Sequence, residues 1–158
     1  MAGKPLRFIH AANLRLDCPL RDVGKLNDEI RETVDAATLI AFDRLVTTAI
    51  DRDVDALLIT GNMFDAGYAS LAAEVAMRDG FDRLDERHVP VFIVPGTIDP
   101  LSAWFELPRL PRNVTVFGDI TDEPVDLTDH GHVIATVIPV NADAAVEPVE
   151  LTNILDGR

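Results

Sequence analysis

The chain has 158 residues, and its 27 acidic against 14 basic residues give a formal net charge of −13. This charge argues against direct binding to DNA through a basic surface and against docking on anionic membranes. The hydrophobic fraction of 47% predicts a globular protein. The single cysteine excludes a disulfide framework within the chain. No apolar run approaches the roughly 20 residues of a membrane helix, and we expect a cytoplasmic protein.

The first two thirds of the chain alternate between strand and helix patterns. Three apolar runs predict strands over residues 6–12, 55–61 and 89–96. Two stretches with apolar residues at intervals of three or four predict helices, from Asn27 or Asp28 to about Arg52 and from Ser70 to about Arg87. This order predicts a parallel sheet with right-handed crossovers.

The helical spacing also predicts which residues face the core. In the first helix these are Ile30, Val34, Ala37, Ala41, Leu45 and Ala49. In the second helix they are Leu71, Val75, Met77, Phe81 and Leu84.

The remaining segments are shorter. In the Pro-rich stretch 100–111, Trp104 and Phe105 are expected to fill the core, and a short strand is expected over 114–118. Residues 124–127 and 133–140 flank a turn at 128–132 that predicts a hairpin. Residues 141–158 are acidic and weakly patterned.

Ligands of open parallel sheets bind beyond the carboxyl ends of the strands. Three such ends carry polar residues here: 13–15, 61–65 and 96–100. The sequence therefore predicts a site built from three loops at one edge of the sheet.

The three loops and their flanks resemble the calcineurin-like metallophosphoesterases, in particular the SbcD-like DNA-repair exonucleases. The flanking residues that carry the resemblance are 8–10, 16–20, 54–57, 90–93 and 110–117. It covers about residues 7–140 and implies the first half of an α/β/β/α sandwich: a parallel βαβαβ core, then a hairpin, with helices outside. It also implies a domain over 1–158 that is incomplete, since the family's later metal ligands, a histidine and a Gly-His-x-His motif, lie farther downstream than this chain extends.

The motifs themselves depart from the family pattern. Asn13 stands where the resemblance implies a metal-binding Asp, Arg15 where it implies a His, and Asn62 where it implies the Asp that bridges two divalent metals such as manganese. Thr97 replaces the family's Asn, and Ile98 replaces the His that assists the leaving group. The polar residues that remain are His10, Asp17, Asp65 and Asp99.

These departures have a chemical consequence. Two dications about 3.5–4 Å apart need anionic ligands between them, and neutral amides at Asn13 and Asn62 supply none. Arg15 adds a permanent cation, and Ile98 cannot donate a proton. We therefore expect no catalytic residue and no bound metal in this chain.

Each residue of the site also has a structural interpretation. Asn13 and Asn62 are expected to be amides that bond the loop backbone, and Arg15 to pair with Asp17, Asp65 or Asp99. Asp65 and Asp99 suit loop capping or ion pairing. His10 is expected to be partly buried and hydrogen-bonded, Cys18 to be a small buried hydrophobe, and His130 and His132 to lie in an exposed turn.

Three functions remain open. The leading one is a non-catalytic SbcD-like homologue that acts as a scaffold or binding module, with a protein partner or self-association; the resemblance implies DNA repair and an ATPase partner of the SbcC type. The second is a weak metal-dependent phosphodiesterase that uses Asp17, Asp65 and Asp99. The third is a phosphate or nucleotide sensor that uses Arg15.

Overall fold

The structure is a computed structural model that describes residues 5–18, 27–68, 70–118 and 123–139. The elements in chain order are β1 (Phe8–Ala12), α1 (Asp28–Asp51), β2 (Ala56–Thr60), α2 (Leu71–Glu86), β3 (Val91–Val94), α3 (Leu101–Glu106), β4 (Val114–Val116), β5 (Val125–Asp129) and β6 (His132–Val137). No helix among these residues is long and apolar enough to cross a membrane.

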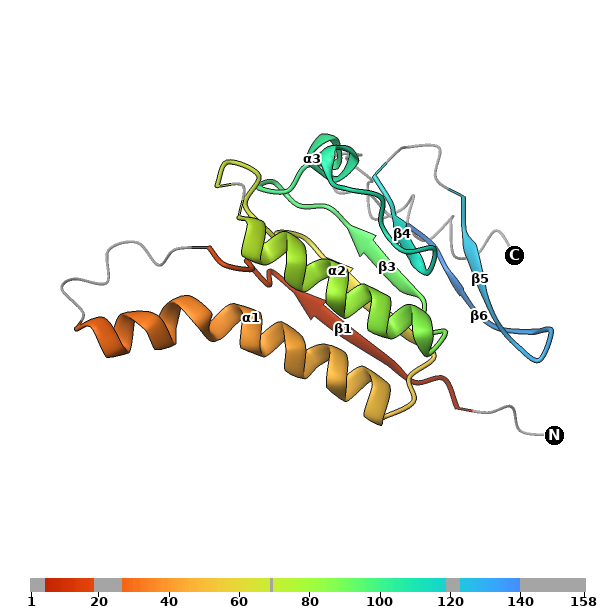
Figure 1. Ribbon diagram of the computed structural model, residues 1–158. Helices are drawn as coiled ribbons and strands as arrows, with labels where there is room; N and C mark the ends of the chain where they lie inside the picture. The colour runs from red at the N-terminus through yellow and green to blue at the C-terminus, as the bar shows by residue number, and fades with distance from the viewer. Residues whose placement is uncertain (1–4, 19–26, 69, 119–122, 140–158) are drawn as a thin grey trace, which may run out of the picture.

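The first four strands form one parallel sheet in the order β1-β2-β3-β4. Phe8 lies opposite Ala56, Leu57 opposite Val91, and Val91 opposite Val114. β5 and β6 form a separate antiparallel hairpin whose turn places His130 and Gly131 at positive φ, as expected of a tight two-residue turn. The predicted fold class, a parallel βαβαβ core followed by a hairpin, is confirmed (Figure 1).

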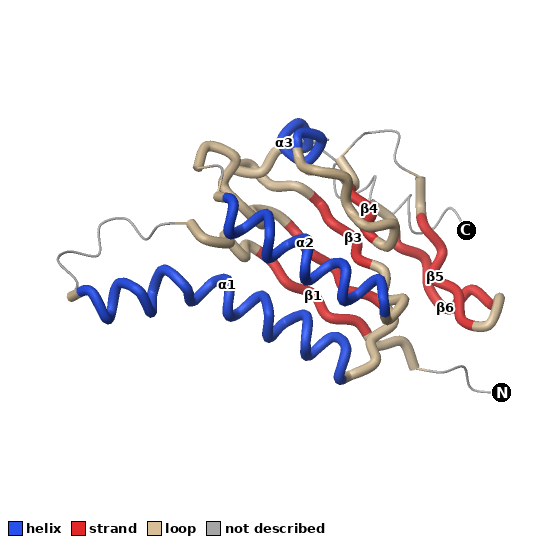
Figure 2. Tube along the Cα trace, viewed as in Figure 1, coloured by secondary structure: helices blue, strands red, loops and turns tan. Residues whose placement is uncertain are grey.

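Both long helices begin where the sequence predicts. The Asn27 side chain accepts a hydrogen bond from the Ile30 amide at 2.8 Å and caps α1, and Ser70 caps α2 by accepting from the Ala73 amide at 3.1 Å. The two helices pack against each other and lie over the same face of the sheet (Figure 2).

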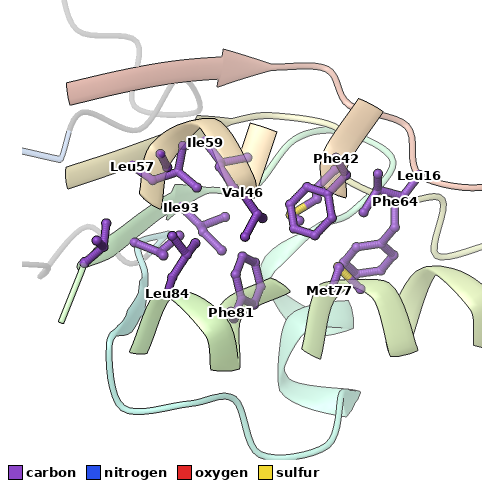
Figure 3. Close-up of a cluster of buried hydrophobic side chains, with 14 of the residues drawn as sticks. Leu16, Phe42, Val46, Leu57, Ile59, Phe64, Met77, Phe81, Leu84 and Ile93 are labelled. Atoms are coloured by element: carbon purple, nitrogen blue, oxygen red, sulfur yellow. The ribbon is translucent and has the colours of Figure 1, made fainter. Parts of the chain in front are cut away.

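The main core fills the space between these helices and the sheet (Figure 3). Phe42 and Val46 of α1 meet Phe81 of α2, and the Phe42 and Phe81 rings cross edge to face at 6.0 Å. Leu57 and Ile59 from β2 and Ile93 from β3 form the side of the core that belongs to the sheet. The buried sheet residues follow the continuous apolar runs that predicted these strands.

The opposite face of the sheet is covered only in part. The hairpin packs Leu127 onto Ala56, Phe92 and Phe117, which form a second, smaller core. On β1, a strand at the edge of the sheet, Phe8 is 53% exposed and His10 and Ala12 are also exposed.

Several predicted core positions are wrong. In α1, Ala49 is buried and Leu45 packs against the core as predicted, whereas Ile30, Ala37 and Ala41 are exposed. Phe42 and Val46, which the prediction left out, are buried because this face of α1 meets α2.

In α2 and beyond, three predicted core residues are exposed instead: Leu71 (72%), Val75 (50%) and Phe105 (78%). They lie on parts of α2 and α3 that neither α1 nor the sheet covers. Trp104 is buried as predicted, but it belongs to a helix, α3, that the sequence did not predict. The segment 141–158 lies outside the described residues.

Candidate functional site

The loops that follow β1 and β2 run side by side at the carboxyl edge of the sheet. The Asn13 amide donates to the Gly61 carbonyl at 3.0 Å, the Arg15 amide to Asn62 at 2.9 Å and the Leu16 amide to Met63 at 2.8 Å. The third loop joins them, because the Ala66 amide donates to the Ile98 carbonyl at 2.9 Å. The structure thus brings together the three loops that the sequence placed at one edge.

A network of amides lies at the centre of these loops. The Asn62 side chain donates through Nδ2 to Oδ1 of Asn13 at 3.2 Å. Its own Oδ1 accepts from the Ile98 amide at 3.3 Å and from the Thr97 hydroxyl at 3.4 Å. The Asn62 side chain thus contacts the first and third loops and bonds the backbone at Ile98, whereas the Asn13 side chain bonds the Asn62 side chain rather than the loop backbone.

Asp99 is the most buried polar residue of the site, with 0% of its surface exposed. Its Oδ1 accepts from the Asn62 amide at 2.9 Å and the Gly96 amide at 2.6 Å, and its Oδ2 accepts from the Met63 amide at 2.9 Å. Three backbone donors thus supply the hydrogen bonds that a buried carboxylate requires. Asp99 caps the second and third loops against each other, which is the structural role that its turn position predicted.

The close approach of these loops depends on Gly96. A Cβ at this position would lie 2.3 Å from the Asn62 backbone nitrogen and 2.5 Å from Asn62 Oδ1. Both distances are far shorter than any real contact of a Cβ, so a side chain at this position would force the second and third loops apart.

The backbone of the first two loops is unusual. Asn13, Arg15, Asp17 and Asn62 have φ values of 55°, 49°, 51° and 53°. Asparagine and aspartate tolerate this left-handed conformation, but arginine does so with more strain. Strained backbone of this kind is concentrated at functional sites in proteins.

Arg15 does not form the ion pair that the sequence suggested. Asp99 is saturated by backbone donors, Asp17 accepts from the Ser70 hydroxyl, and Asp65 accepts from the Gly67 amide at 2.9 Å. Within the described residues the exposed Arg15 guanidinium has no hydrogen bond or ion pair.

Cys18 lies next to these charges. Burial raises the pKa of its thiol above the ordinary value; the nearby Arg15 charge acts in the opposite direction, and Asp65 and Asp17 raise the pKa further. The thiol is therefore protonated at neutral pH, which does not suit a nucleophile. Cys18 is only partly buried, rather than the fully buried hydrophobe expected from the sequence.

The histidines lie apart from the amide network. His10 is exposed rather than partly buried, and its Nε2 lies 2.8 Å from the Thr60 hydroxyl on the uncovered side of β1. His130 and His132 are exposed at the hairpin turn, as predicted.

The donor set does not fit a pair of divalent metals. Among the described residues, no group of three or more His, Cys, Asp or Glu side chains is placed to hold a metal ion. Asp17, Asp65 and Asp99 are not gathered into one cluster, and both oxygens of Asp99 face backbone amides. Asn13 and Asn62 bring neutral oxygens where two dications would need negative charge.

Two contacts of the site had no sequence signal. Ser70 was predicted only as a helix cap, yet its hydroxyl also donates to Asp17, and the Thr38 hydroxyl accepts from the Asp17 amide at 2.9 Å. These contacts fasten the first loop to both long helices. The partners are 53 and 21 residues apart in the chain, so only the packing of the helices brings them together.

No protein-family model matches the chain. Over 132 residues it is 30% identical to a protein of Bacillus subtilis (strain 168) named Uncharacterized metallophosphoesterase YhaO. The match includes 84% of this chain and 32% of the Bacillus protein, so the chain spans about a third of that relative. Most of this chain is thus similar to part of a metallophosphoesterase, a match that supports the metallophosphoesterase superfamily.

Proposed function

We propose that this protein is an SbcD-like homologue that does not hydrolyse phosphodiesters and acts as a binding module. The observation that carries the proposal is the Asn62 amide, which stands where the resemblance implies a metal-bridging carboxylate and is hydrogen-bonded to Asn13 at 3.2 Å. A side chain bonded in this way ties loops together, and it brings no charge to hold two dications.

Metal content and hydrolysis together test this proposal. We expect the protein, purified without chelator, to contain less than about 0.1 equivalent of manganese, iron or zinc, because one retained dication already needs anionic ligands. We also expect no manganese-dependent hydrolysis of bis(p-nitrophenyl) phosphate. Stoichiometric metal together with hydrolysis would refute the proposal, provided that Asn62→Ala abolishes the hydrolysis and the control Asp53→Asn leaves it unchanged.

A second candidate function rests on Arg15. Its exposed guanidinium has no hydrogen bond or ion pair among the described residues, and its backbone amide bonds the Asn62 carbonyl at 2.9 Å, so a free cation belongs to the loop that meets the amide network, which suits recognition of a phosphate or a nucleotide phosphate. Titration with inorganic phosphate and with ATP tests it. Arg15→Gln is expected to abolish binding and Arg44→Gln, an exposed arginine of α1, to preserve it; equal binding by both variants would exclude this function.

Self-association or a protein partner belongs to the same proposal. Among the residues that the structure describes, β1 has a neighbouring strand on one side only, and its outward residue Phe8 is 53% exposed. An unpaired edge beside an apolar side chain favours association. Sedimentation equilibrium is expected to show a dimer that Phe8→Ser weakens, and a monomer at all concentrations would exclude self-association through this edge.

A further inference from the structure

The surface between α2 and α3 carries apolar side chains that the core does not use. Leu71 and Val75 of α2 are 72% and 50% exposed, and Tyr68, just before α2, is 51% exposed. Monomeric proteins seldom gather large exposed apolar residues in one region without a binding role.

Two hollows open on this surface. The first, of about 170 Å³, is lined by apolar residues that include Leu16, Phe64, Met77 and Leu107. The second, of about 140 Å³, is lined by Leu71, Val75, Pro108 and Leu110 and shares Glu74, Met77 and Leu107 with the first. Because they share these walls, the hollows form one surface, which we call the α2–α3 groove.

The charges around the groove have one dominant sign. The first hollow is lined by Asp65, Glu74 and Glu106 and by no basic residue. The second adds Arg78, whose guanidinium donates to the Arg109 carbonyl at 2.9 Å. Neither Glu74 nor Glu106 forms an ion pair in the described part of the chain.

An apolar hollow with a carboxylate rim fits a side chain that has a long aliphatic stem and a cationic end. Lys and Arg bury such stems against apolar surface while the charged group stays at the rim. The second hollow, lined mostly by apolar side chains, fits a Leu or aromatic side chain one helical turn away. We propose that the α2–α3 groove docks a basic amphipathic segment of a partner protein, with Lys or Arg in the first hollow and an apolar residue in the second.

Charge disfavours a second copy of this chain as the occupant. A self-complementary contact would bring Asp65, Glu74 and Glu106 of two chains, each with a net charge of −13, toward each other. Like charges placed face to face oppose association, whereas a basic segment gains from the same charges. The inference rests on the proposed binding function for its biological role; the groove shares Leu16 and Asp65 with the loops, but Asn13, Asn62 and Asp99 do not line it.

Fluorescence anisotropy with a labelled synthetic peptide tests the inference. The probe is an amphipathic peptide of about 15 residues, with Leu and Arg spaced at three and four positions. Two control peptides carry Glu in place of Arg or Ser in place of Leu. We expect the probe alone to bind, and its affinity to fall as salt shortens the screening length to about 8 Å or less.

Variants locate the binding on the protein. The double change Glu74→Gln and Glu106→Gln is expected to weaken binding about tenfold, and Leu71→Ser or Val75→Ser by a similar factor. All these side chains are solvent-accessible, so folding should survive, which circular dichroism checks. Matched controls on α1 are Asp43→Asn for charge and Ile40→Ser for an exposed apolar residue (48%); both should bind as wild type.

Two results overturn the inference. Equal weakening by groove and control variants would mean that the peptide responds to net charge alone. A dimer of the protein alone that Leu71→Ser dissociates would make a second copy the occupant. Neither result bears on catalysis, which the metal and hydrolysis measurements test separately, so failure of this inference is distinguishable from failure of the proposed function.

Discussion

Removal of the Asp99 carboxylate is the sharpest test of the loop architecture. The side chain is fully buried and accepts three backbone hydrogen bonds, from Asn62, Met63 and Gly96. Asp99→Ala leaves these three donors without an acceptor. Asp99→Asn keeps the shape of the side chain but turns an NH₂ group toward at least one donor.

The expected cost follows from the burial of each bond. A hydrogen bond to a charged acceptor contributes about 1.5–3 kcal/mol, and an orphaned buried donor costs about 1–3 kcal/mol. The bond to Met63 is buried, whereas those to Asn62 and Gly96 are partly buried and water can replace part of their value. We therefore expect Asp99→Ala to lower the free energy of unfolding by about 4 kcal/mol and Asp99→Asn by about 2 kcal/mol.

Urea unfolding followed by fluorescence measures both changes. The protein has one tryptophan, Trp104, which is buried and packs edge to face on Phe64 at 5.1 Å, close to the loops. The matched control is Asp53→Asn at an exposed position with φ of 49°, where asparagine is well tolerated, so its cost should stay below about 0.5 kcal/mol. An Asp99→Ala variant as stable as this control would refute the structural role of the carboxylate.

Three further measurements follow from the structure. Gly80→Ala should destabilise by about 1–3 kcal/mol in urea unfolding, because the new Cβ would lie 2.6 Å from the buried Phe42 ring; a gain in stability would contradict this packing. Alkylation of Cys18 by iodoacetamide at neutral pH should slow in Arg15→Gln, which raises the thiol pKa, and quicken in Asp65→Asn, which lowers it; equal rates would contradict these charge effects. Because the folded thiol pKa is raised, wild type should lose stability as pH rises above about 8.5, where the unfolded thiol ionises first, and Cys18→Ala should lose less.

The sequence by itself determined the order of strands and helices and the parallel sheet. The spacing of apolar residues and the capping of helices are local properties. The caps Asn27 and Ser70 and the apolar strands could therefore be predicted from the sequence. The convergence of the three loops followed from the rule that parallel strands end at one edge. The short helix α3 was not predicted, because six residues in a Pro-rich stretch carry too little periodicity to reveal it.

Tertiary structure decided which apolar residues are buried and which polar residues meet. Leu71, Val75 and Phe105 have the same hydrophobicity as core residues, and only the position of α1 and the sheet leaves them exposed. Likewise, nothing local distinguishes a capping Asp99 from a metal ligand. The distinction came from the three backbone amides that donate to Asp99, those of Asn62, Met63 and Gly96. Two of these donors lie 37 and 36 residues from Asp99 in the sequence, so only the packing of the loops brings them to the carboxylate.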